Sequence, residues 1–195
     1  MSEREKSLLK KLLLIAIPIA IQNLINVGVS VTDTLMIGNI DELQLAGISQ
    51  ANQPYFIFTT LIFGLASGAM VLNSQYWGKE DTNSIKSIMA FMMRIAVVGG
   101  LLGSIVVLAF PEQVVSIFTN EHIVIKYGAR YIKIVGISYI FSAFTGVYLM
   151  GLRSIQNVKI SMCIYGLSFV LNVFLNYILI FGHLGMPRLE IQGAA

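Results

Sequence analysis

The sequence predicts an all-α membrane protein, a polytopic bundle of five transmembrane helices followed by the start of a sixth. Of its 195 residues, 56% are hydrophobic and only 12% are charged, whereas a soluble domain carries about 25% charged residues. The mean hydropathy is +0.77. The apolar residues gather in five long stretches, and about 20 such residues are enough to cross a bilayer as a helix.

The five helices are predicted from these stretches in chain order. Residues 1–11 contain four Lys or Arg residues and are predicted to form a cytoplasmic N-terminal segment. Residues 12–195 then form one unit. We expect its helices at about residues 12–38, 50–76, 88–110, 131–152 and 160–181, with a truncated sixth helix from about residue 191.

The connections have signals of their own. Asp41 and Glu42 lie in a short acidic loop that is predicted to cover residues 39–47. Pro111 ends the third stretch, because proline removes a helical hydrogen bond. Residues 112–122 are amphipathic and are expected to lie along the outer surface. In the second stretch, Gly64 and Gly68 form a pair of small residues that would let a neighbouring helix approach closely.

The first predicted helix carries a polar stripe. Its only formal charge within residues 12–38 is Asp33, and a carboxylate at mid-helix costs roughly 2.5–3.5 kcal/mol on insertion scales. At 100° per residue, Gln22 and Asn26 fall within about 20° of Asp33, and Ser30 falls within about 60°. Lipid cannot solvate such a stripe, so it should face other helices or internal water. It either locks helix packing or lines a cavity, and Asp33 is the candidate working residue.

The fifth predicted helix carries a second stripe and no charge. Its polar residues are spaced four, three, four and four apart, which places them on one helical face: Ser161, Tyr165, Ser168, Asn172 and Asn176. The two stripes are therefore expected to meet. Asp33 with Asn172 and Asn176 would offer oxygen ligands to Na⁺, and the same carboxylate could instead carry a proton. Gln22, Asn26, Ser30, Tyr165 and Ser168 are the candidate cavity-lining residues.

Loop charges predict the orientation. The N-terminal segment and the connections before the third and fifth helices hold nine of the thirteen Lys and Arg residues. The positive-inside rule then places the N-terminus in the cytoplasm. The basic residues make no aromatic-interleaved patch, so no nucleic-acid partner is expected. No nucleophile elbow, P-loop, dinucleotide fingerprint or metal-ligand spacing is present, and we expect neither an enzyme nor a cofactor.

Four runs of residues resemble the first lobe of multidrug and toxic compound extrusion (MATE) transporters. They are PIAIQNLINVGVSVTDTLMIGNI, SQYWGKED, GLRSIQNVK and LNVFLNYILIFGHLGMPRLEIQGAA, in matching order and spacing over essentially the whole chain. The resemblance implies a two-lobe, twelve-helix transporter that exchanges a cation for an organic, usually cationic, drug across a prokaryotic inner membrane. It also implies a cation site at Asp33, Asn172 and Asn176.

The resemblance leaves the coupling ion open between Na⁺ and H⁺. Some members carry a second carboxylate on the fifth helix, where this chain has amides, and that difference favours Na⁺. With only one lobe, the chain is expected to need the C-terminal lobe or a second chain, and not to transport alone. Two other readings stay open: a flippase for lipid-linked precursors, and a non-transporting membrane assembly or fragment. Polyanionic flippase substrates would call for buried Lys or Arg, which the two polar stripes lack.

Overall fold

The structure is a computed structural model, and it describes residues 3–38, 41–182 and 193. In these residues it contains six helices and no strand, so the predicted all-α class is confirmed. The helices are α1 (Glu3–Gly38), α2 (Glu42–Gly78), α3 (Thr82–Ala109), α4 (Pro111–Ser116), α5 (His122–Ser154) and α6 (Val158–Phe181). All except α4 are long and apolar enough to cross a membrane, which gives five candidate spans.

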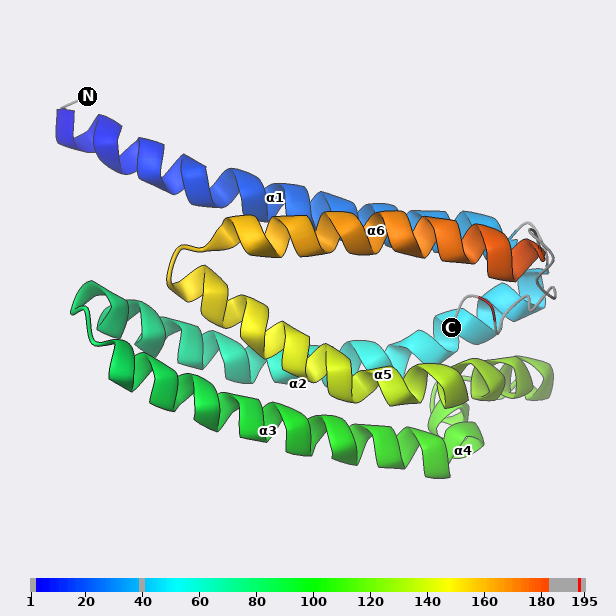
Figure 1. Cartoon of the computed structure of the whole chain (residues 1–195). Helices are drawn as coiled ribbons and strands as arrows, with labels where there is room; N and C mark the ends of the chain where they lie inside the picture. Colours follow the sequence, from blue (N-terminus) through cyan, green and yellow to red (C-terminus); the bar gives the residue numbers. More distant parts are fainter. Residues whose placement is uncertain (1–2, 39–40, 183–192, 194–195) are drawn as a thin grey trace.

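The long helices form two groups (Figure 1). Helices α2, α3 and α5 pack on one another as a bundle, and α5 has the largest interfaces with both of its neighbours. Helices α1 and α6 lie side by side and form a pair. The pair contacts the bundle much less closely than each group packs within itself. The site described below lies where the two groups face each other.

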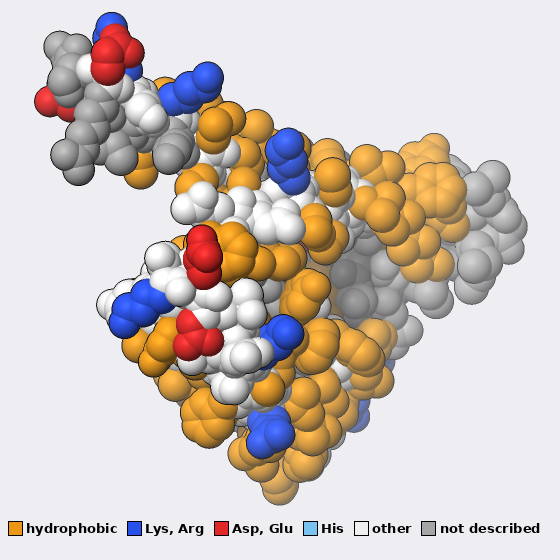
Figure 2. All heavy atoms as spheres, turned by 60° about the vertical axis from the view of Figure 1, so that its left-hand side comes forward, with side chains coloured by type: hydrophobic (Ala, Val, Ile, Leu, Met, Phe, Trp, Pro, Cys, Tyr) orange, Lys and Arg blue, Asp and Glu red, His pale blue; other side chains and the backbone are white. Residues whose placement is uncertain are grey.

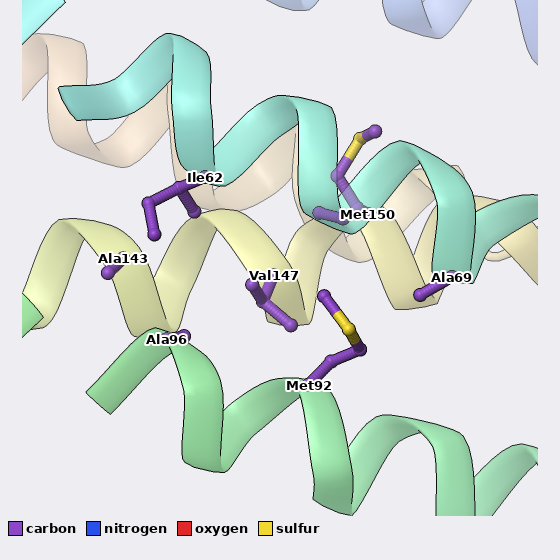
Figure 3. Close-up of a cluster of buried hydrophobic side chains, with 8 residues drawn as sticks. Ile62, Ala69, Met92, Ala96, Ala143, Val147 and Met150 are labelled. Carbon is purple, nitrogen blue, oxygen red and sulfur yellow. The ribbon is translucent and has the colours of Figure 1, made fainter. Parts of the chain in front are cut away.

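The main core of the bundle lies at the junction of α2, α3 and α5 (Figure 3). It is built mostly from small and flexible side chains, and these include Ala69, Met92, Ala96, Ala143 and Met150. The small residues let the helices approach closely. At Gly100 of α3, an added Cβ would lie 2.7 Å from the Cα of Ile140, so this crossing accepts no larger residue without moving backbone.

Several predicted boundaries were too short, because the helices extend beyond their apolar stretches. Helix α1 begins at Glu3, so residues 3–11 continue the first helix instead of forming a separate segment. Helix α2 begins at Glu42, where an acidic loop was predicted. The cause is a cap: the carboxylate of Asp41 accepts a hydrogen bond from the Leu43 amide at 3.0 Å. Helix α5 likewise begins at His122, nine residues before its predicted start.

The segment after α3 is folded against the bundle instead of lying freely on its surface. Pro111 starts the short helix α4, where its missing amide hydrogen has no cost. Val115 of α4 is fully buried and packs near Gly128 of α5. The apolar side of this amphipathic segment thus packs on the bundle, while Glu112, Gln113 and Ser116 are exposed. That residues 112–122 lie along the outer surface stays a prediction.

Close helix approach occurs at other glycines than the predicted pair. A Cβ added at Gly64 or Gly68 would meet nothing within 4 Å. A Cβ at Gly47 of α2 would instead lie 2.7 Å from the Cβ of Tyr127 on α5, and one at Gly128 would lie 2.9 Å from the Gly47 carbonyl oxygen. Gly47 lies in the predicted acidic loop, and Tyr127 and Gly128 lie before the predicted start of the fourth helix, so the tight α2–α5 contact falls outside the predicted helices.

Hydrophobic side chains cover most of the face shown in Figure 2, and charged side chains gather at one end. That end carries the start of α1, the α2–α3 turn and the α5–α6 turn (Figure 1). The N-terminus and the loop around Lys79 therefore lie at the same end of the bundle, as the charge pattern predicts. The predicted sixth helix falls on residues 191–195, of which the structure describes only Gly193.

Candidate functional site

The two polar stripes face each other across the α1–α6 interface. Asn176 of α6 is 4% exposed, and its Nδ2 donates a hydrogen bond to Oδ1 of Asp33 on α1 at 2.6 Å. The same Nδ2 approaches Oδ1 of Asn172, one turn earlier on α6, at 3.4 Å. Asp33 itself is partly buried. The structure thus brings the three predicted cation-site residues together in one network.

A groove opens between the α1–α6 pair and the bundle, with a volume of about 480 Å³. Its walls combine aliphatic and aromatic side chains with hydroxyl and amide groups, and none of its described lining residues is charged. Four helices contribute to it: α1 with Asn26 and Val29, α2 with Tyr55, α5 with Phe141, Ser142, Thr145, Gly146 and Leu149, and α6 with Ile164, Tyr165, Ser168 and Asn172.

Asn172 belongs both to the groove and to the hydrogen-bond network at Asp33. It lines the groove, and its Oδ1 lies beside the amide that holds Asp33. A molecule in the groove and a cation at Asp33 would therefore share one side chain.

Gln22 does not line the groove but closes one end of it. Its side chain is fully buried; Nε2 donates to the Val158 carbonyl oxygen at 3.2 Å, and Oε1 accepts from the Arg153 guanidinium at 2.6 Å. Gln22 lies one helical turn beyond Asn26 on α1, and Arg153 lies one turn beyond Leu149 on α5. The bridge therefore sits directly past the last groove residues of both helices.

The other candidate lining residues divide between two faces. Asn26, Tyr165 and Ser168 line the groove. Ser30 instead lies with Asn26 in a shallow depression along α1, and its hydroxyl donates to the Asn26 carbonyl oxygen at 3.3 Å. Of the predicted lining set, Gln22 and Ser30 are thus absent from the groove wall.

A match to a family model shows which family the chain belongs to. The family model MatE matches residues 18–178, which is well over half of the chain. The chain belongs to the MatE family. It corresponds to the N-terminal lobe of a MATE transporter, and it is a multi-pass membrane protein.

Curated relatives of this MatE chain carry the name "Probable multidrug resistance protein NorM". The one from Thermotoga maritima is 24% identical over 187 residues, which cover 95% of this chain and 40% of the relative. The one from Streptococcus pneumoniae strain TIGR4 is 30% identical over 198 residues, which cover 98% and 43%. The chain therefore spans about two-fifths of the length of the curated relatives it matches.

Solved structures share the fold. A multidrug resistance MATE family transporter of the MOP superfamily, in an outward-facing conformation, matches with a TM-score of 0.85 and 17% identity. A MOP superfamily transporter from Pyrococcus furiosus matches with a TM-score of 0.84 and 17% identity. Each match covers 95% of this MatE chain and 40% of the other chain.

The bundle of this MatE chain supplies site residues that sequence reasoning missed. Tyr131 of α5 lies within electrostatic range of Asp33 and forms a hydrogen bond with Asn52 of α2. Tyr55 of α2 donates to the Ser142 hydroxyl of α5 at 3.0 Å. Asn52 and Tyr55 lie on either side of Pro54 in α2. Their partners on α5 are about 80 residues away in the sequence, and only the fold reveals them.

The described residues contain no group of three His, Cys, Asp or Glu side chains that could hold a metal ion. The Asp33 network instead offers one carboxylate and two amides. Such hard oxygen ligands suit an alkali cation and do not suit transition metals, which prefer nitrogen and sulfur.

Proposed function

We propose that this chain forms one lobe of a cation-coupled multidrug efflux antiporter, with the coupling cation bound at Asp33, Asn172 and Asn176. The observation that carries the proposal is the 2.6 Å contact between Asn176 Nδ2 and Asp33 Oδ1 beside the groove. An ionisable group held by amides inside a membrane-spanning bundle is typical of an ion pathway.

The network can serve either coupling ion. In the structure, the amide nitrogen of Asn176 faces Asp33 and donates a hydrogen bond to its carboxylate. A half-turn of that amide would present its oxygen instead, and Na⁺ would then meet oxygens from all three side chains. A proton would bind to Asp33 itself and break the charge-assisted hydrogen bond. In both cases, occupation by the ion changes the contact that joins α1 to α6.

Coupling follows from the position of Asn172. Because this residue lines the groove and also approaches Asn176, a ligand in the groove disturbs the ion network, and an ion in the network reshapes the groove. Such reciprocal effects are the thermodynamic requirement for coupling two binding sites. Alternating access would then need a second lobe, or a second chain, to form the opposite wall.

The substrate class follows from the lining. The groove is amphipathic, and its described wall contains neither Lys nor Arg. A drug-like organic cation fits this wall, with the Asp33 carboxylate as the nearby negative charge. A polyanionic lipid-linked precursor does not, because phosphate groups need cationic partners. Arg153 is already engaged by Gln22 beyond the end of the groove.

The proposal also includes the membrane in which the chain lies and its orientation there. We place the chain in a prokaryotic inner membrane, with its basic end, which carries the N-terminus, in the cytoplasm. No organic cofactor is required, because the energy comes from the ion gradient.

The test uses the purified chain and a full-length transporter that contains it. Titration calorimetry should detect binding of Na⁺, or proton uptake on acidification, and Asp33→Asn should abolish it. Ser30→Ala is the control, because Ser30 faces away from the network. In the full-length protein, Asp33→Asn should keep the fold and abolish gradient-driven efflux of a fluorescent cation. Normal efflux by that variant would remove Asp33 from the mechanism. Efflux by the 195-residue chain alone in proteoliposomes would refute the need for a second wall.

A further inference from the structure

A second cavity adjoins the groove in the crevice between α2 and α5. Its volume is about 190 Å³, and we call it the side pocket. It shares three lining residues with the groove, namely Tyr55, Ser142 and Gly146. The two cavities are therefore neighbours that share part of their walls.

The boundary between the cavities is held in place. The Tyr55 hydroxyl donates to the Ser142 hydroxyl oxygen at 3.0 Å, which ties α2 to α5 at the mouth. Behind it, the rings of Tyr55 and Tyr139 lie 5.2 Å apart, and Tyr139 stacks on Phe58 at 4.9 Å. Tyr139 is 1% exposed. The mouth thus has a fixed aromatic wall.

The chemistry of the side pocket selects a flat apolar group. Its wall includes the large apolar side chains of Phe58, Ile62, Phe63 and Met150. The hydroxyl of Thr59 is already bonded to the Tyr55 carbonyl oxygen at 2.9 Å, so it has little demand for a ligand. Aromatic rings pack well against other rings and against methionine sulfur. An apolar cavity of about 150 Å³ is large enough for benzene, so the side pocket can take a single ring or a small fused ring system.

Gly146 lies on the wall that the two cavities share. It lines both of them, and a Cβ added there would meet nothing within 4 Å. A Cβ at position 146 would therefore occupy space that is now open, without colliding with the protein.

We propose that the side pocket is a subsite for the aromatic ring of an amphipathic cation, and that Gly146 sets the size of the ring it accepts. The charged end of the ligand stays in the groove, on the side of Asn172 and Asp33. This inference rests on the proposed function and adds a specificity-determining residue to it. A cation without an aromatic ring would use the groove alone.

The experiment compares two probes on the purified chain. Ethidium is a charged fused-ring system with an uncharged phenyl substituent, which the side pocket would take while the charged rings stay in the groove. Tetraethylammonium is a cation without a ring. Gly146→Leu should lower the affinity for ethidium by about tenfold or more, because the lost ring burial is worth a few kcal/mol. It should leave the affinity for tetraethylammonium within about twofold. Gly146→Ala should give a smaller loss for ethidium in the same direction.

Gly64→Leu is the matched control. Gly64 is also a mid-helix glycine with open space at its Cβ, but it is exposed and lines neither cavity. Unchanged ethidium binding in Gly146→Leu would overturn the inference, as would an equal loss of both probes. Wild-type chain that binds tetraethylammonium but not ethidium would overturn it and leave the proposed function intact. Wild-type chain that binds neither cation would overturn both.

Discussion

The α1–α6 pair and the α2–α3–α5 bundle are both made of membrane-length helices, but different forces hold them. Small buried side chains close the bundle, and Ala96 and Ala143 are each 1% exposed there. Of the α1 side chains that the structure describes, Gln22 alone is buried. Polar contacts fix α1 at two places, Gln22 with Arg153 and Val158, and Asp33 with Asn176.

This difference assigns a role to each group. Close van der Waals packing does not respond to ions, so the bundle is a fixed frame. If the proposed cation site is correct, the hydrogen bond to the Asp33 carboxylate would change when a cation or a proton binds, and the position of α1 would then depend on the ion. Motions with two discrete states are expected where few packed contacts oppose them. The α1–α6 pair is therefore the part that can switch, and the following predictions test that division.

The largest effect is expected inside the bundle. Gly100→Ala places a Cβ 2.7 Å from the backbone of Ile140, whereas Gly99→Ala makes an ordinary contact of 3.5 Å with the Ile62 side chain. Gly100→Ala should lower the free energy of unfolding by about 1–3 kcal/mol. Gly99→Ala should change it little or raise it, since alanine favours a helix. Unfolding in mixed detergent micelles measures both, and equal values would contradict a close-packed frame.

A smaller loss is expected at the end of the groove. Gln22→Leu removes the acceptor of the Arg153 guanidinium and the donor to the Val158 carbonyl oxygen. Leaving buried partners unsatisfied costs about 1–3 kcal/mol, and we expect the lower part of that range because Arg153 is only partly buried. Asn23→Leu, on the exposed side of α1, is the control. If Gln22→Leu is as stable as that control, the bridge does not fix α1.

A still smaller change in stability should come from the ion network. Asn176→Ala should cost about 0.6 kcal/mol, which is typical of a hydrogen bond between membrane helices. Asn172→Ala should cost about the same, because Asn172 also forms a side-chain hydrogen bond with Asp33 and approaches Asn176 at 3.4 Å. The effect on cation binding should be at least as large. Asn176→Ala should weaken the free energy of cation binding by at least as much as it lowers the free energy of unfolding. Calorimetry and unfolding on the same samples separate the two.

Much of this architecture could be predicted from the sequence. Apolar length predicts the five spans, and helical spacing predicts that Asp33 faces Asn172 and Asn176. Their role in ion binding stays a prediction. The extension of α2 was missed because its polar cap, Asp41, begins the helix before the apolar stretch starts. The extension of α5 was missed because its first turns contain charged residues, including Lys126 and Arg130. The bridge from Gln22 to Arg153 was missed because it depends on the geometry of the α5–α6 turn. The Gly64–Gly68 pair did not mark a close helix contact. Its spacing is typical of one, but within this chain a Cβ at either position would meet nothing within 4 Å.

The smallest predicted effect concerns two similar turns at the basic end. The α2–α3 and α5–α6 turns each contain a residue with positive φ, Glu80 at 59° and Gln156 at 63°, followed by a capping position. Asp81 caps α3, because its carboxylate accepts from the Ser84 hydroxyl at 2.6 Å and from the Ser84 amide at 3.0 Å. Asn157 makes no side-chain cap to α6. The α2–α3 turn, which belongs to the bundle, therefore has a side-chain cap, and the α5–α6 turn has none.

This difference should be visible as a pH dependence. The hydrogen bonds from the Ser84 hydroxyl and amide hold the pKa of the Asp81 carboxyl below its usual range. A carboxyl with a lowered pKa in the folded state stabilises the protein above its unfolded pKa, near 4, and that contribution is lost as the pH falls through the folded value. Asp81→Asn should therefore lower the thermal midpoint slightly at pH 7, and the gap from the wild type should close toward pH 2–3. Asn157→Ala should give no such gap at either pH. A pH-independent gap for Asp81→Asn would mean that the side chain acts through its shape and not through its charge.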